Sequence, residues 1–107
     1  NKKFMANILK KNEIKNSKKI VNKINFLSKR FAAKEALAKA LGTGFRNGLN
    51  FKDIEILNDR LGKPYYVLNI RLKNQIKKKK RIKNFNLFLS ISDEKDYSIA
   101  FTMIQSV

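Results

Sequence analysis

The chain has 107 residues, which is enough for one compact domain and too few for two. It contains no cysteine and no histidine, which excludes disulfides, thiol catalysis, imidazole acid–base chemistry and zinc sites of the usual ligand types. With 25 basic and 8 acidic residues, its formal charge of +17 fits nucleic acid, a membrane surface, or an acidic or phosphorylated partner. A bound metal would be a hard cation on oxygen ligands, such as magnesium.

The first half of the chain has helical patterns. We expect a short helix near residues 2–10 and a second segment, 20–24, that leads into the strongest helix at 26–41. The apolar stripe of that main helix consists of Leu27, Phe31, Ala38 and Leu41. Gly42 stands where a left-handed C-terminal cap is wanted, and Gly44 frees the turn that follows.

The second half changes to alternating patterns. Strands are expected at 53–58 and 65–68 around a turn at 59–64, followed by a basic helix over 69–81 around Leu72 and Ile76. Two further strands carry alternating core residues, connected by a four-residue Asp-Glu-Lys-Asp loop: Phe85, Leu87, Leu89 and Ile91, then Tyr97, Ile99, Phe101 and Met103. Helices followed by mainly antiparallel strands indicate an α+β fold, with residues 1–107 forming a single domain. No apolar run approaches the roughly 20 residues that cross a bilayer.

Glu35 and Lys39 are the first candidates for chemistry, because a separation of four places them on one helix face. They fit an ordinary surface ion pair worth about 0.3–0.5 kcal/mol. They also fit a magnesium ligand beside a phosphate-binding lysine.

Two glycine-containing segments have similar ambiguity. Gly42-Thr43-Gly44 lies at a helix C-terminus, where the dipole disfavours anions, so it is a weak phosphate cradle and a strong cap. Gly62-Lys63-Pro64 fits a turn between strands, or a turn that directs Lys63 toward an anion.

The run from Lys77 to Arg81 is the best argument for nucleic-acid binding. The aromatic residues, however, fit alternating core positions and are not interleaved with the basic ones as stacking platforms. We therefore interpret the run as a solvated helix end.

Three segments together carry a family resemblance: RFAAKEALAKALGTGFRNGL, DIEILNDRLGKPYYVL and LFLSISDEKDYSIAF. In this order they resemble the holo-acyl-carrier-protein synthases, the phosphopantetheinyl transferases of bacterial fatty-acid synthesis. The resemblance runs from about Phe26 to the C-terminus and extends more faintly into FMANILKKNEI. It implies the 4′-phosphopantetheinyl transferase fold, with helices on a small, mainly antiparallel sheet.

The resemblance also implies a reaction: transfer of 4′-phosphopantetheine from coenzyme A to a serine of apo acyl carrier protein, with release of adenosine 3′,5′-bisphosphate. It makes Glu35 the Mg²⁺ ligand and Lys39 a neighbour of the diphosphate. The coenzyme-binding residues that it implies, with the glycine turns included, are Arg30, Lys39, Gly42, Gly44, Lys63, Pro64, Ser90 and Ser92. An acidic carrier protein, a homotrimer with sites between subunits, and a cytoplasmic location are the corresponding expectations.

The sequence departs from the family pattern at two points. The family's first strand carries Gly-Thr-Asp-Ile, whose Asp is the second metal ligand, and this sequence has no such segment, so we expect an N-terminally incomplete domain or a reduced metal site. Asp93 stands where many relatives have histidine. The general base stays open between a metal-bound water and another carboxylate. The alternatives are a decayed homologue that binds coenzyme A or carrier protein without turnover, and a basic nucleic-acid-binding domain.

Overall fold

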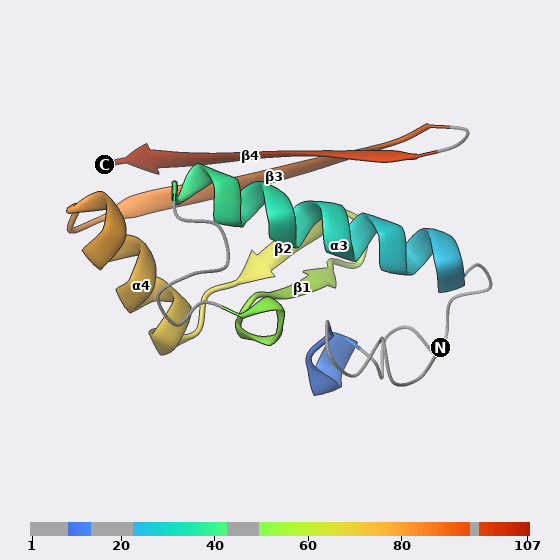
Figure 1. The fold of residues 1–107 in the computed structure, drawn as a ribbon, viewed down its shortest axis with the longest axis horizontal. Coiled ribbons are helices and arrows are strands. Elements are labelled where there is room, and N and C mark those ends of the chain that lie inside the picture. The colour runs from blue at the N-terminus through green and yellow to red at the C-terminus, as the bar shows by residue number, and fades with distance from the viewer. Residues whose placement is uncertain (1–8, 14–22, 43–49, 95–96) are drawn as a thin grey trace.

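The computed structural model describes residues 9–13, 23–42, 50–94 and 97–107. Within them, helix α3 (Lys23–Ala40) runs along one face of a long hairpin formed by β3 (Phe85–Asp93) and β4 (Ser98–Ser106) (Figure 1). The described residues also form a short hairpin, β1 (Glu55–Asn58) and β2 (Pro64–Val67), and helix α4 (Ile70–Lys80). The α+β class is confirmed, although the expected small sheet is two separate two-stranded antiparallel sheets. In the described parts of the chain, no helix combines the length and apolarity needed to cross a bilayer.

Helix α3 begins slightly before the predicted start at residue 26 and is built largely from good helix formers. Its buried side recurs every three or four positions and includes two cations: Phe26, Arg30, Ala33, Lys34, Leu37, Ala38 and Leu41. The predicted stripe was therefore half right. Ala38 and Leu41 lie in the main core, whereas Leu27 and Phe31 are only partly buried against a small second cluster. The buried line passes through Arg30 and Lys34, which hydrophobic periodicity treats as surface residues.

The end of α3 has the predicted cap. The Gly42 amide donates to the carbonyl of Lys39 at 2.9 Å, and the φ of Gly42 is +83°, a left-handed conformation that suits glycine. Gly44 and the short helix expected near residues 2–10, apart from its last two residues, lie outside the described residues.

The β1–β2 hairpin is shorter than predicted at its start. Residues Phe51–Asp53 form a 3₁₀ turn instead of strand, because the Asp53 carboxylate accepts a hydrogen bond from the Asn50 amide at 2.9 Å. The turn after β1 is organised by Asp59, whose Oδ1 accepts the amides of Leu61 and Lys63 at 2.9 and 2.8 Å. Side-chain acceptance of backbone amides is a common way to fix a tight turn.

Helix α4 follows the prediction closely. The side chain of Asn69 caps its N-terminus by accepting the Leu72 amide at 2.8 Å, and Arg81 ends it in a left-handed conformation. Leu72 and Ile76 are buried as expected. The lysines of its last turn lie where the helix dipole favours positive charge, so the basic run is a helix end.

The β3–β4 hairpin corrects one prediction. Phe85, Leu87, Leu89 and Ile91 pack against the core as expected, but the residues of β4 that face the same way are Ala100, Thr102 and Ile104. Ile99, Phe101 and Met103, predicted as core, lie on the opposite, exposed face with Phe88. Both faces of β4 carry apolar residues, so alternation alone did not identify the buried one.

Candidate functional site

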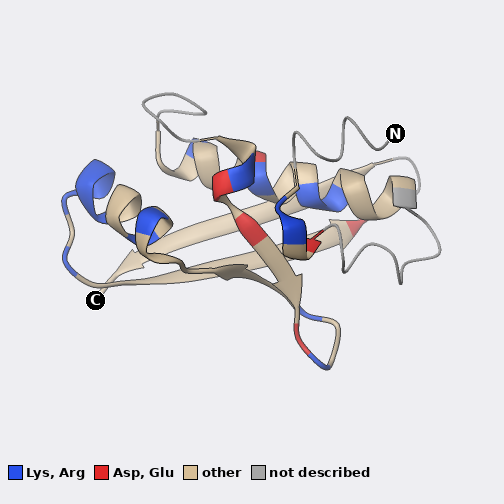
Figure 2. Ribbon diagram, turned by 90° about the horizontal axis from the view of Figure 1, so that it is seen from below, with Lys and Arg blue, Asp and Glu red and all other residues tan. Residues whose placement is uncertain are grey.

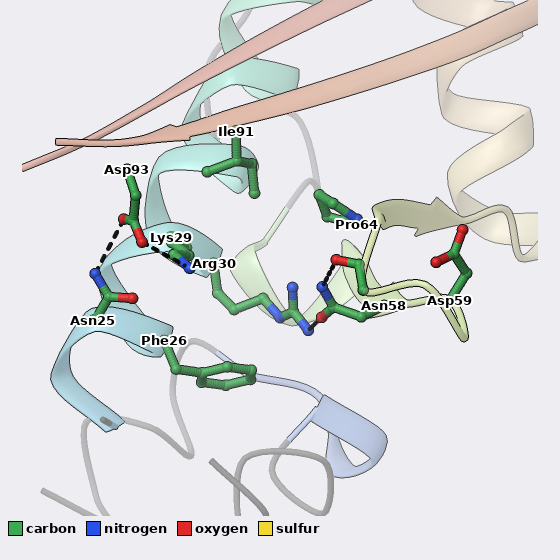
Figure 3. Close-up of a pocket in the computed structure, with 10 residues that line it drawn as sticks. Asn25, Phe26, Lys29, Arg30, Asn58, Asp59, Pro64, Ile91 and Asp93 are labelled. Atoms are coloured by element: carbon green, nitrogen blue, oxygen red, sulfur yellow. Dashed lines mark hydrogen bonds and ion pairs between the residues drawn. The ribbon is translucent and has the colours of Figure 1, made fainter. Parts of the chain in front are cut away.

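A pocket of about 450 Å³ opens where the first half of α3, the β1–β2 turn and the end of β3 meet (Figure 3). Ten residues from these three elements line it: Asn25, Phe26, Lys29, Arg30, Asn58, Asp59, Gly62, Pro64, Ile91 and Asp93. The lining combines two cations and two carboxylates with apolar surface from Phe26, Pro64 and Ile91. Such a mixture suits a ligand that has both an anionic group and a flat apolar part.

Arg30 is the central cation of this pocket and is only 2% exposed. Its guanidinium carbon lies 4.6 Å from the centre of the Phe26 ring, and its Nη2 donates to Asn58 Oδ1 at 2.6 Å. Burial lowers the pKa of Arg30, and the nearby Glu13 carboxylate partly opposes that shift. A planar cation held in this way can bind phosphate oxygens in a fixed direction.

The Gly-Lys-Pro turn is tied to Arg30 through Asn58. Asn58 Nδ2 donates to the Gly62 carbonyl at 2.9 Å, so one side chain contacts both the guanidinium and the turn (Figure 3). Pro64, one of the residues expected to bind the coenzyme, lines the pocket. Lys63 is exposed and does not line the pocket, although its backbone belongs to the turn.

Asp93 forms the opposite wall and connects the hairpin to α3. Its carboxylate lies 2.9 Å from Lys29 Nζ and accepts hydrogen bonds from Asn25 and Ser98 at 3.1 and 3.0 Å. The hydrogen bonds from Lys29, first, and then from Asn25 lower the pKa of Asp93. The carboxylate is therefore ionised near neutral pH and forms an ion pair with Lys29.

The predicted site residues Ser90 and Ser92 lie on the other face of β3. Strand residues alternate between faces, so Ile91 and Asp93 line the pocket while the two serines point away from it. The Ser92 hydroxyl donates to Glu94 Oε1 at 3.1 Å.

Glu35 and Lys39 lie further along α3, about 7.5 and 13.5 Å from Arg30 by the helical rise. Glu35 is half-buried and Lys39 exposed, and the structure records no ion pair between them. Among the described residues Glu35 has neither a hydrogen-bond nor an ion-pair partner. A carboxylate with both oxygens uncommitted can supply one ligand to a hard cation, although the described residues contain no group of three potential ligands. Gly42 is exposed just beyond Lys39.

Sequence reasoning missed Glu13, which is fully buried and contacts both cations on the buried side of α3. The available signal was its isolation, because Glu13 and Glu35 are the only acidic residues before Asp53. Asn58 was also missed, since nothing in its sequence context separates it from other turn residues.

Known proteins resemble this chain over nearly its whole length. The family model of the 4′-phosphopantetheinyl transferase superfamily matches residues 1–102. A holo-[acyl-carrier-protein] synthase of Pelagibacter ubique (strain HTCC1062) is 55% identical over 102 residues, which cover 95% of this chain and 80% of that protein.

Two solved structures agree with the fold. The holo-[acyl-carrier-protein] synthase of Neisseria meningitidis superposes with a TM-score of 0.83 and 37% identity over 98% of this chain and 81% of that one. The holo-(acyl-carrier-protein) synthase of Bacillus anthracis, in complex with CoA (3′,5′-ADP), superposes with a TM-score of 0.79 and 34% identity. The match covers 99% of this chain and 83% of that one. The fold and the pocket together define an α+β domain of a class that can bind phosphorylated ligands through an arginine beside apolar surface. Within that class, this chain belongs to the 4′-phosphopantetheinyl transferase superfamily.

Proposed function

We propose that this chain transfers the 4′-phosphopantetheine arm of coenzyme A to a serine of apo acyl carrier protein. The serine oxygen forms a bond to the phosphorus nearer the pantetheine, the phosphoanhydride bond breaks, and adenosine 3′,5′-bisphosphate leaves. The observation that carries this proposal is the pocket beside Arg30, in a chain 34% identical to a synthase whose structure is a complex with CoA (3′,5′-ADP).

The pocket offers separate surfaces for the two ends of a nucleotide. The Arg30 guanidinium belongs to the lining and is the group that would meet phosphate oxygens, and the apolar lining from Pro64 and Ile91 suits the flat adenine ring. We propose that the bisphosphate end of coenzyme A binds here. The diphosphate and pantetheine would then extend along α3 toward Glu35 and Lys39. These two residues lie one helical turn apart, so the carboxylate could hold a cation beside a phosphate bound by the lysine.

Glu35 is the residue that would hold Mg²⁺, because its half-buried carboxylate has no competing partner in the described part of the chain. When bound, the ion supplies neutralisation and polarisation of the diphosphate. Lys39 would stabilise negative charge as it grows on the leaving bisphosphate.

An acidic acyl carrier protein is the proposed second substrate, and the net charge of +17 would accelerate its docking. The basic end of α4 lies at the other end of the molecule from the pocket (Figure 1). We therefore expect its role to be general electrostatics and not a specific nucleic-acid site. Because the reaction consumes coenzyme A, we expect it in the cytoplasm.

A homotrimer is also proposed. The outward face of the β3–β4 hairpin leaves Phe88, Ile99, Phe101 and Met103 exposed, and apolar surface of this kind usually marks a contact with another chain. Sites between neighbouring subunits would follow if the hairpins meet.

Intact-protein mass spectrometry tests the proposed reaction directly. Apo acyl carrier protein is incubated with this chain, coenzyme A and magnesium, and we expect a gain of one phosphopantetheine that depends on the metal. No gain under any metal condition would overturn the proposed transferase activity of this chain. Coenzyme A binding without that gain would instead favour a non-catalytic homologue.

Glu35→Gln separates the metal site from the fold. We expect transfer to fall by about a hundredfold or more, because an amide is a weak ligand for a hard cation. The thermal midpoint should not change, since Glu35 makes no hydrogen bond or ion pair with the described residues. Glu94→Gln makes the same chemical change at an exposed position outside the pocket and should keep full activity. Equal rates for the two variants would remove Glu35 from the metal site.

A further inference from the structure

Glu13 is a buried carboxylate that the proposed chemistry does not use. It belongs to the short helical segment at residues 11–13 and is 0% exposed. Its Oε1 accepts from Lys34 Nζ at 2.7 Å and from the Lys10 amide at 3.0 Å. Its Oε2 accepts the Ile56 amide of β1 at 3.0 Å and lies 3.7 Å from Arg30 Nε. One side chain thus connects the N-terminal segment, α3 and β1.

Charge explains why an acid stands at this point. Arg30 and Lys34 are both buried on the same side of α3, and burial lowers the pKa of each, while Glu13 opposes the shift. Without Glu13, the two cations would lie in the interior with their nearest counterion gone. Lys34 Nζ also donates to the Phe51 carbonyl at 2.8 Å, a contact that does not depend on Glu13.

Arg30 connects this buried cluster to the pocket. The Nε side of its guanidinium faces Glu13, and Nη2 donates to Asn58, which in turn donates to the Gly62 carbonyl. Figure 3 shows the guanidinium end of Arg30 beside Asn58 in the pocket. The guanidinium thus has a charge contact with Glu13 at 3.7 Å on its Nε side, where Nε makes no hydrogen bond to a described residue, and a hydrogen bond to Asn58 on its Nη2 side. We therefore expect its direction to depend on Glu13 as well as on Asn58.

We propose that Glu13 is a positioning residue that fixes Arg30 and so sets the affinity of the pocket for the phosphorylated nucleoside end of its substrate. The inference rests on the proposed function, in which this pocket binds the bisphosphate end of coenzyme A. Its distinctive consequence is that a residue outside the pocket controls binding and leaves the chemical step unchanged.

Lys34 provides a matched control. It makes the shorter contact with Glu13, at 2.7 Å, but does not line the pocket. Lys34→Met breaks a buried ion pair of Glu13 and keeps the contact between Glu13 and Arg30. Loss of stability alone would make Glu13→Gln and Lys34→Met behave alike, whereas positioning affects binding only in Glu13→Gln.

The experiment is calorimetric titration of adenosine 3′,5′-bisphosphate and of coenzyme A into the full chain and both variants, below their thermal midpoints. We expect Glu13→Gln to weaken binding of both ligands about tenfold, equivalent to about 1.4 kcal/mol. Lys34→Met should bind within about twofold of the unmodified chain. In steady-state transfer, Glu13→Gln should raise KM for coenzyme A and leave kcat nearly unchanged.

Three results would overturn the inference. Glu13→Gln could bind as tightly as the unmodified chain, Lys34→Met could lose as much affinity, or kcat could fall while KM holds. If Glu13→Gln does not fold, Glu13→Asp decides, because it keeps the charge and draws the carboxylate back from Arg30: KM for coenzyme A should rise, and an unchanged KM would overturn the inference. An unmodified chain that binds neither ligand overturns the proposed function itself, and the inference with it.

Discussion

Tyr66 shows how much a single side chain contributes to this small core. Its hydroxyl donates to the Ala33 carbonyl of α3 at 2.6 Å and lies 2.6 Å from the Thr102 hydroxyl of β4. The residue itself belongs to β2, so one buried phenol joins three elements. Burial raises its pKa, and the hydrogen bond with Thr102 only partly opposes that rise.

We predict that Tyr66→Phe lowers the free energy of unfolding by about 1–2 kcal/mol at neutral pH, the cost of leaving buried partners unsatisfied. The pKa of Tyr66 is higher in the folded than in the unfolded chain, so its stabilising effect is complete below 10.0, the ordinary value, and is lost as pH rises above it. Urea unfolding at neutral pH and above 10.0 measures both. A Tyr66→Phe difference that stays constant with pH would contradict this account.

Whether a single residue could be predicted depended on whether it belongs to a recognisable sequence motif. Pro64 and Arg30 were predicted to bind coenzyme A because they belong to motifs with a family resemblance, and the structure places both in the pocket lining. Glu13 and Asn58 were missed because their partners, Arg30, Ile56 and Gly62, are brought close only by the tertiary fold. A buried ion pair resembles a surface charge when only the sequence is read.

At the scale of elements, the contact between α3 and the β3–β4 hairpin beside the pocket depends on Asp93. Its carboxylate pairs with Lys29 and accepts from Asn25, both on the first turns of α3. Asp93→Asn would keep Oδ1 for Asn25 and Ser98 and would remove both the charge and the Oδ2 acceptor that faces Lys29. The variant therefore separates the contact with Lys29 from the hydrogen bonds with Asn25 and Ser98.

We predict that Asp93→Asn lowers stability slightly at neutral pH and low salt, and that high salt abolishes the difference, because the pair is exposed and screened. The pKa of Asp93 is lower in the folded chain, so its contribution is present above the ordinary value of 3.8 and is lost as pH falls through the folded pKa. Denaturant unfolding of both proteins over acidic and neutral pH, at two salt concentrations, checks this. A deficit that survives high salt would show that the charge is not its source.

Most elements were predictable because their signals are local. Asn69 and Arg81 delimit α4, and Gly42 ends α3, each by backbone chemistry that depends on neighbours in sequence. The buried face of β4 was not predictable. The larger residues Ile99 and Phe101 point outward, since α3 and Tyr66 approach the inner face where Ala100 and Thr102 stand. Which of the two alternating sets of β4 residues is buried depends on how closely the helix packs against that face of the strand. The alternating pattern alone does not contain that information.

At the scale of the whole molecule, charge and apolar surface are separated. Figure 2 shows Lys and Arg concentrated on the helices, while β3 and β4 are nearly free of charged residues until the end that leads into their connecting loop. The outward face of the hairpin therefore combines exposed apolar side chains with little charge to keep copies apart. Phe101, at 63% exposed, is the most exposed of its four large residues. This pattern supports self-association through the hairpin.

We predict that Phe101→Asp dissociates the proposed trimer into monomers. A symmetric assembly buries the substituted residue in every subunit, so each contact would receive an uncompensated carboxylate. Ile70→Asp is the matched control, because Ile70 is equally apolar and 79% exposed but lies at the first turn of α4, where an acid is favourable. Light scattering after size exclusion should give a trimer for the unmodified chain and for Ile70→Asp, and a folded monomer for Phe101→Asp.

Transfer activity should fall when the trimer dissociates if neighbouring subunits complete the site. A Phe101→Asp trimer would show that subunits meet elsewhere, and a fully active monomeric unmodified chain would show that one copy is sufficient.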